Sequence, residues 1–294
     1  MFSNISGMSV VYGLASGYDT FAAQFFGAKQ YRLVGVGLQR CLLVCTAASV
    51  PVYIMWLFTA SILTLCGIEK ELARDVQSFV LILAVGLAPA YVFDSCRKYL
   101  QCQGFMTPAF VVTVASLLFH TMIMYFLVPL DLLGMGVFGG ALAISISNIV
   151  NAGLILAYIR FFFDYKVTWY GWTTECMEHL GDFLRIALPS AGMVCLEWWC
   201  FEVITLISGS LPDAGTAVAA QTVLFNTVAT TFLCGLGIGI SASARVGNAL
   251  GAGKPMSARR VMLVAISGGT ALLILLATII FFNRRSWVSL FTND

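Results

Sequence analysis

Residues 183–211 read FLRIALPSAGMVCLEWWCFEVITLISGSL, and this stretch decides the fold of the chain. It is apolar and longer than the about 20 residues that a helix needs to cross a bilayer. Two carboxylates, Glu197 and Glu202, nevertheless stand near its middle. An acidic group at the centre of a membrane helix costs about 2.5–3.5 kcal/mol, so it normally faces a bundle interior, finds a partner or takes up a proton. We therefore interpret Glu197 as a functional group; the alternative is that neighbouring helices merely satisfy both acids.

The composition extends this interpretation to the whole chain. Hydrophobic residues make up 60% of the 294 residues and charged residues 10%, whereas soluble domains have about 25% charged residues. Continuous apolar runs satisfy their backbone in lipid only as helices. The predicted fold class is therefore all-α, a polytopic membrane bundle of about eight transmembrane helices. The eight apolar segments span residues 8–26, 34–66, 76–100, 108–129, 136–163, 183–211, 216–246 and 261–282.

The basic residues predict the orientation of the bundle. Twelve Lys and Arg residues flank the connections after the first, third, fifth and seventh segments, and four flank the other side. Cytoplasmic loops carry the excess of Lys and Arg, so the first set of connections is predicted to be cytoplasmic. The chain then starts on the outer side, and we expect a further helix upstream of Met1.

Charged and polar residues inside the other segments have local explanations. Asp94 lies three and four residues before Arg97 and Lys98, a spacing that puts all three on one helix face and predicts local ion pairs. Asp19 is expected near the cytoplasmic end of its segment, either solvated or paired with a base in a loop. His120 is expected to be neutral and hydrogen bonded, with a proton relay as the alternative.

An internal repeat predicts two halves. The stretches GLASGYDTFAAQFFGAK and GIGISASARVGNALGAG match at a shift of 224 residues, which aligns Gln24 with Asn248 and Gly27 with Gly251. Both stretches end a helix at the predicted cytoplasmic face, and an even number of spans separates them, so the repeats are parallel. Two halves related by an axis along the membrane normal are a known transporter plan. If the second half is complete, the whole chain has at least roughly 450 residues, so we expect this sequence to be part of a longer one.

The repeat and the charges divide the chain into three parts. Residues 1–164 are predicted to form an N-terminal lobe that lacks its first helix. Residues 165–182, which mix charges with tryptophans, are predicted to be a cytoplasmic linker between lobes. Residues 183–294 then supply the first three helices of a C-terminal lobe.

Four long motifs resemble one transporter family. They are YDTFAAQFFGAKQYRLVGVGLQR (18–40), KYLQCQGFMTP (98–108), WYGWTTECMEHLGDFLRIALPSAGMVCLEWWCFEV (169–203) and ARVGNALGAGKPMSARR (244–260). The chain resembles the multidrug and toxin extrusion (MATE) transporters, and among them the animal type that exports organic cations in exchange for protons. The resemblance implies twelve helices in two lobes around a central cleft, of which this chain corresponds to helices two to nine. It also implies that Glu197 binds a cation or proton and that Glu202 is a second acid of animal members.

These residues suggest an exchange mechanism. Ionised Glu197 attracts an organic cation, on which Trp198 or Trp199 stacks. Because a bare charge is costly in hydrocarbon, Glu197 is expected to accept a proton readily and then to release the cargo. Glu202 lies about 7.5 Å further along the helix and roughly 140° around it. We therefore expect it on another wall of the cleft, in a supporting role.

Three further residues are candidates to line the cleft. Asn148 can hydrogen bond across helices or line a cavity, and Gln39 is a second amide inside a span. His120 is the third, although it stands where animal relatives usually have an asparagine.

Other classes of protein fit the sequence less well. The nine cysteines form no CxxC pair, and the two histidines are not at metal-ligand spacing, so we predict no metal site and no cofactor beyond a proton gradient, with sodium the less favoured ion. An integral-membrane transferase would need a polar catalytic cluster, and none is evident, so we do not expect an enzyme. A truncated, non-transporting membrane protein stays open as the alternative.

The expected partners are organic cations or xenobiotics and the lipid bilayer, without nucleic acid. We expect a monomer when complete, in the plasma membrane or the membrane of an acidic organelle.

Overall fold

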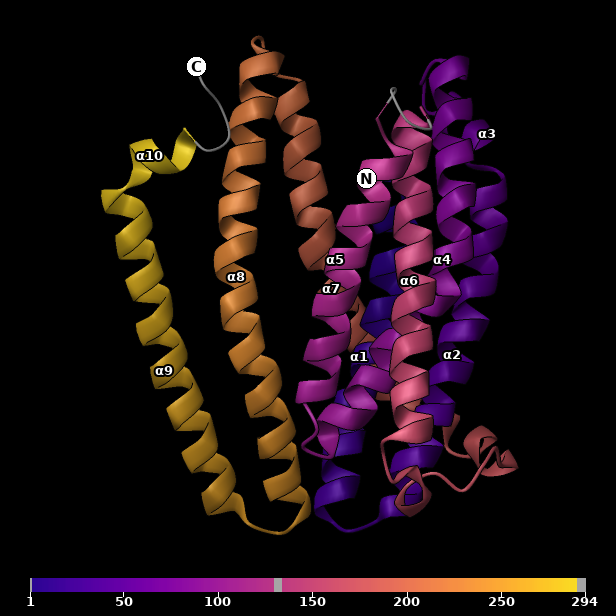
Figure 1. Cartoon of the computed structure of the whole chain (residues 1–294), viewed down its shortest axis with the longest axis vertical. Coiled ribbons are helices and arrows are strands. Elements are labelled where there is room, and N and C mark those ends of the chain that lie inside the picture. Colours follow the sequence, from indigo (N-terminus) through magenta and orange to yellow (C-terminus); the bar gives the residue numbers. More distant parts are fainter. Residues whose placement is uncertain (1, 130–133, 290–294) are drawn as a thin grey trace.

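The computed structural model describes residues 2–129 and 134–289 (Figure 1). Its regular elements within these ranges are all helical, which confirms the predicted all-α class. The helices are η1 (Asn4–Met8), α1 (Ser9–Gly27), α2 (Tyr31–Leu57), α3 (Thr59–Leu65), α4 (Lys70–Cys102), α5 (Thr107–Leu127), α6 (Gly136–Phe161), η2 (Tyr165–Val167), η3 (Thr174–Met177), α7 (Leu180–Gly209), α8 (Ala214–Gly251), α9 (Pro255–Phe282) and α10 (Arg284–Val288).

Seven of the described helices are long and apolar enough to cross a membrane: α2, α4, α5, α6, α7, α8 and α9. The first predicted span, residues 8–26, corresponds to α1, which is not among the seven. Its 19 residues include several glycines and serines as well as Asp19, and many of them are buried against other helices. A helix surrounded by protein needs less hydrophobic surface than one that faces lipid, so α1 can be polar and still lie inside the bundle.

The second predicted span consists of two helices. The first helix, α2, contains Pro51 and ends at Leu57, and α3 begins at Thr59. The backbone break lies at Phe58, at the outer end of α2.

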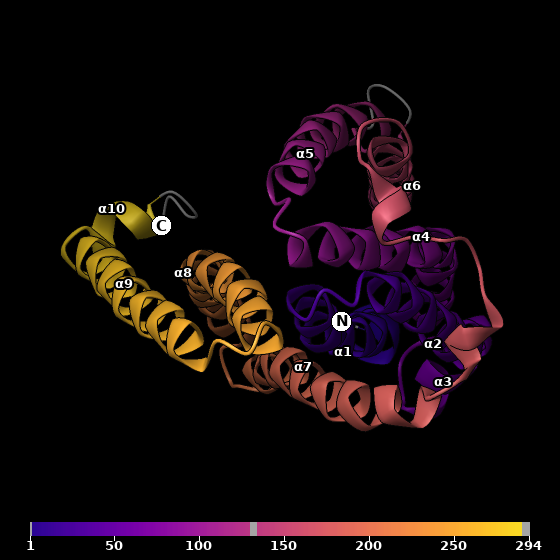
Figure 2. The same ribbon diagram turned by 90° about the horizontal axis from the view of Figure 1, so that it is seen from below.

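Close packing joins α1 to α7. A Cβ atom on Gly13 would lie 2.6 Å from the Cα atom of Ala191, and one on Gly17 would lie 2.7 Å from that of Ala187. Only glycine allows two helix backbones to approach this closely. Figure 2 shows α7 running along α1 on the side opposite α4.

The two repeated stretches contact each other reciprocally. A Cβ atom on Gly27 would lie 2.1 Å from the carbonyl oxygen of Asn248, and one on Gly251 would lie 2.1 Å from that of Gln24. These are the pairs that the repeat equates, Gln24 with Asn248 and Gly27 with Gly251. A reciprocal contact between equivalent residues is what a two-fold relation produces. We call it the glycine contact; it joins the ends of α1 and α8 at the lower side of Figure 1.

The segment between α6 and α7 is fastened to α2 by side chains. Gln39 donates a hydrogen bond to the carbonyl oxygen of Gly171 (2.7 Å) and accepts one from the amide of Thr173 (3.1 Å). Arg32 forms an ion pair with Glu175 at 2.8 Å. The segment from residue 165 to 182 is therefore held in place against the bundle, although its sequence reads as a linker.

Candidate functional site

A cavity of about 520 Å³ lies between η1, α7 and α8. We call it the carboxylate cavity because both Glu197 and Glu202 line it. The remaining lining residues are Asn4, Trp198, Phe201, Thr205, Phe225, Val228, Ala229, Phe232 and Leu233. No basic side chain occurs among these described lining residues, so the only full charges on the wall are the two carboxylates.

Glu197 and Glu202 line the same cavity. Their separation of roughly 140° around α7 predicts that they stand on different walls of this space. The rest of the lining comes from α7 itself, from α8 and from η1. The side-chain amide of Asn4 donates a hydrogen bond to Glu202 Oε1 at 3.1 Å, which closes the η1 side.

The two tryptophans beside Glu197 have different positions. Trp198 lines the cavity, and its ring lies 6.2 Å from that of Tyr12 at an interplanar angle of 42°. Trp199 is directed toward η1 and α1, where its indole N–H lies 3.1 Å from the carbonyl oxygen of Ile5 and 3.3 Å from Ser9 Oγ. Trp198 is thus the one placed to contact a ligand, and Trp199 fixes α7 to the start of the bundle.

The chemistry of the cavity suits an organic cation. Carboxylates supply the opposite charge, and the faces of Trp198, Phe201, Phe225 and Phe232 can attract a cation through their quadrupoles. Phe201 and Phe225 meet edge to face with their centroids 5.3 Å apart. A mostly apolar pocket with a few convergent polar groups is the usual form of a small-molecule site.

Sequence reasoning missed the part of the wall that α8 contributes. Phe225, Val228, Ala229 and Phe232 recur at the spacing of a single helix face and together cover one side of the cavity. That periodicity was visible in the sequence. It indicates only that α8 has such a face, however, and not which neighbour the face meets.

The three other cleft candidates lie elsewhere. Gln39 is buried and bonded to the segment after α6. His120 Nδ1 lies 2.9 Å from Ser147 Oγ, so the expected hydrogen bond joins α5 to α6. Asn148 lies beside Gly86 at the contact between α6 and α4. None of the three is among the described residues that line the carboxylate cavity.

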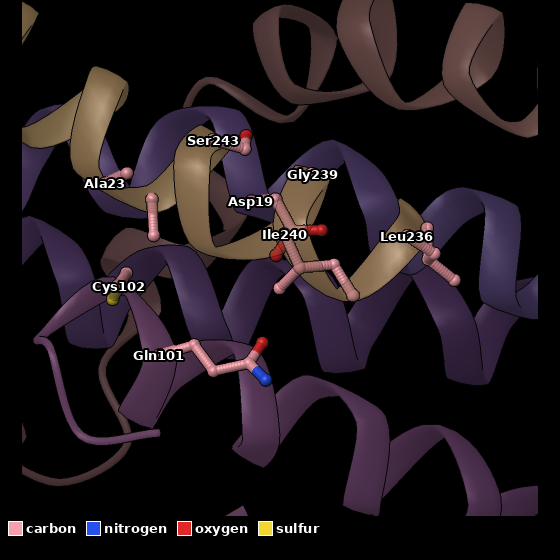
Figure 3. A pocket seen from close by; sticks show the side chains of 9 residues that line it. Asp19, Ala23, Gln101, Cys102, Leu236, Gly239, Ile240 and Ser243 are labelled. Carbon is pink, nitrogen blue, oxygen red and sulfur yellow. The ribbon is translucent and has the colours of Figure 1, made fainter. Parts of the chain in front are cut away.

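A second cavity of about 210 Å³ lies nearer the glycine contact, between α1, α4 and α8. Figure 3 shows Asp19 there, facing side chains of α4 and α8. Lys98 Nζ lies 3.3 Å from Asp19 Oδ2 and 3.1 Å from Asp94 Oδ2, and Arg97 also pairs with Asp94. The predicted local pairs of Asp94 are confirmed, whereas Asp19 pairs with a helix residue and not with a loop base. Because two bases balance the two acids, this cluster attracts a cation less strongly than the carboxylate cavity does.

Comparison with known proteins identifies similar sequences and structures. The family model described as MatE matches residues 1–126 and 189–294. The chain is 32% identical to "Protein DETOXIFICATION 16" of Arabidopsis thaliana over 293 residues, covering 100% of this chain and 60% of that protein. It is 37% identical to "Multidrug and toxin extrusion protein 2" of Mus musculus over 298 residues, covering 99% of this chain and 50% of that protein.

A solved structure matches over the whole described fold. The "eukaryotic MATE transporter AtDTX14" superposes with a TM-score of 0.87 at 31% identity, covering 100% of this chain and 65% of that one. The chain thus spans about 50–60% of the length of these two curated relatives.

Proposed function

The chain belongs to the MATE family, and we propose that it forms the part of a secondary transporter that binds an organic cation and exchanges it for protons. The observation that supports this proposal is the cavity between α7 and α8, which combines two carboxylates with four aromatic side chains and lacks a basic one among its described residues. Family membership and seven candidate spans favour a multi-pass membrane transporter over a membrane transferase.

Glu197 is the proposed exchange site. In the ionised state it attracts the cation electrostatically, and Trp198 covers one face of the bound molecule. Protonation removes the charge, and with it the main attraction, so cargo and proton compete for one group. Glu202, held by Asn4, adds a second negative charge to the same space. Lowering the pH on the side to which the cavity opens should therefore weaken cation binding.

We propose protons, and not sodium, as the coupling ion, and the plasma membrane or an acidic-organelle membrane as the location. A proton needs only one carboxylate to bind and release it. A pH difference across either membrane then supplies the driving force. Replacing sodium by potassium at constant pH should leave exchange unchanged, and a requirement for sodium would refute the coupling.

The decisive experiment is transport by the 294-residue chain reconstituted in vesicles. A fluorescent organic cation should accumulate in response to an imposed pH gradient, and Glu197→Gln should abolish the accumulation. Glu71→Gln is the matched control, because Glu71 is an exposed carboxylate in the first turn of α4. Equal loss in both variants, or undiminished uptake with Glu197→Gln, would contradict the role of Glu197.

The alternative, a bundle that binds without transporting, calls for a separate binding measurement. A cation in the cavity should quench the fluorescence of Trp198, so titration in detergent reports binding without transport. Quenching that Glu197→Gln reduces, without vesicle uptake by the unmodified chain, would support the binding site and reject transport by this chain.

A further inference from the structure

We propose that a groove beneath the segment joining α6 to α7 binds one anionic phospholipid of the cytoplasmic leaflet. The groove has a volume of about 500 Å³ and is lined by α2, α4, α6 and the segment after α6, whereas η1, α7 and α8 line the carboxylate cavity. We call it the linker groove. Its lining residues are Leu38, Leu42, Val92, Cys96, Tyr99, Leu156, Ile159, Arg160, Tyr165, Trp169 and Trp172.

The walls change character along the groove. The deeper part is aliphatic, from Leu42 on α2, Val92 on α4 and Leu156 on α6. Val92 lies ten residues before the end of α4 at Cys102, which corresponds to about 15 Å along the helix axis. This apolar path runs into the membrane from the predicted cytoplasmic surface and suits an acyl chain.

The mouth of the groove is aromatic and basic. Trp169 and Trp172 meet edge to face with their centroids 5.5 Å apart, and Tyr165 lies next to them on the same segment. Tryptophan and tyrosine favour the headgroup level of a bilayer. The Arg160 guanidinium lies 5.7 Å from the centre of the Tyr165 ring, so the mouth carries a positive charge beside its aromatic side chains.

The charge favours an anionic headgroup over a zwitterionic one. Arg160 forms no ion pair with any described carboxylate. Asp164 and Lys166, both exposed on the same segment, offset each other, which leaves the charge of Arg160. A guanidinium can bind phosphate through two parallel hydrogen bonds. Basic pockets at the cytoplasmic ends of transmembrane helices bind anionic lipid headgroups in this way.

The groove is preformed and accessible from lipid. The hydrogen bonds of Gln39 to Gly171 and Thr173 fix the backbone that carries the two tryptophans. Trp172 is 68% exposed and Leu156 is 46% exposed, so both present surface outward. Figure 2 shows α2 and α6 on the side of the bundle away from α8 and α9.

Brominated lipids test the proposal, because bromine quenches nearby tryptophan fluorescence. The chain is reconstituted in phosphatidylcholine vesicles that contain brominated phosphatidylglycerol or, at equal mole fraction, brominated phosphatidylcholine. We expect about a fivefold preference for the anionic lipid, equivalent to about 1 kcal/mol for one basic residue at the surface. Trp172→Phe should remove most of the preferentially quenched signal, which assigns it to the groove.

Two arginine variants and two soluble anions complete the test. Arg160→Gln should abolish the preference, whereas Arg185→Gln, which removes an exposed arginine at the start of α7, should keep it. Equal quenching by both lipids, or a preference that survives Arg160→Gln, would overturn the proposal. Competition by inorganic phosphate or glycerol 3-phosphate would also overturn it, because the acyl chain would then contribute nothing. Cation transport does not enter this measurement, so its outcome is independent of the proposed function.

Discussion

Replacing Gly251 with alanine should force apart the two helix ends that meet at the glycine contact. The added Cβ atom would lie 2.1 Å from the carbonyl oxygen of Gln24 and 2.9 Å from the amide nitrogen of Ala28, whereas ordinary contacts begin at 3.4 Å. The oxygen must therefore withdraw by 1.3 Å, the difference between 3.4 and 2.1 Å. Both blocking atoms belong to the backbone, so no side-chain rotation relieves the clash and α1 must move as a unit.

The energetic cost follows from two opposing effects. Overpacking costs about 1–3 kcal/mol, and the upper part of this range applies because backbone is displaced. Alanine regains at most about 0.5–1 kcal/mol relative to glycine in a helix. We expect Gly251→Ala to lower the free energy of unfolding by about 2 kcal/mol, and Gly27→Ala to do the same because its contact is the reciprocal one.

Gly237→Ala is the matched control for this prediction. It lies on the same helix, but a Cβ atom there would meet no atom within 4 Å, so the variant should be stabilised by about 0.5–1 kcal/mol. The free energies of unfolding of Gly251→Ala, Gly27→Ala and Gly237→Ala are measured by chemical unfolding in detergent micelles, with helix content followed by circular dichroism. Spin labels on the exposed Lys29 and Lys254 should move apart in Gly251→Ala and Gly27→Ala but not in Gly237→Ala. Equal stability of the Gly251 and Gly237 variants would refute the glycine contact.

Three further variants address other parts of the molecule. Lys98→Met leaves Asp19 without its ion pair and Asp94 with one fewer base. Because breaking a buried pair costs about 3–5 kcal/mol and Asp19 is partly exposed, we expect a loss near 3 kcal/mol in the same unfolding assay; an unchanged value would contradict the contact. Trp199→Phe should lose about 1 kcal/mol of stability with its hydrogen bonds but keep cation affinity in a fluorescent-cation binding titration. Trp198→Phe should keep stability and weaken cation binding about two- to fivefold. Weaker binding in Trp199→Phe together with lost stability in Trp198→Phe would contradict these assignments.

The sequence predicted what a single helix determines. The paired charges at Asp94, Arg97 and Lys98 follow from the geometry of one helical turn, and the structure places them as expected. The link from Lys98 to Asp19 joins residues 79 positions apart in the chain, so it depends on how α4 packs against α1. No local spacing contains that information.

The same limit explains the candidate site. The depth of Glu197 in an apolar run predicted an unusual carboxylate, because the cost of burying a charge depends on local hydrophobicity. The wall that Glu202 faces depends on α8 and η1, which residue angles on α7 cannot show. Gln39 was predicted to line the cleft because it is polar inside a span. Its amide instead bonds a segment about 130 residues later, and the polarity has a structural use.

The glycine contact and the carboxylate cavity lie on one helix, and this connects them mechanically. On α8, Phe232 lines the cavity and Gly251 makes the contact, 19 residues or about 28 Å apart along the axis. Across the cavity, α7 is fixed to α1 by the close approach of Gly13 to Ala191. A change in the tilt of α8 about its glycine end must therefore alter the distance between Phe232 and Glu197. Because the fulcrum is a backbone contact that a single methyl group disrupts, Gly251→Ala should change cation affinity as well as stability, although position 251 is far from the carboxylates.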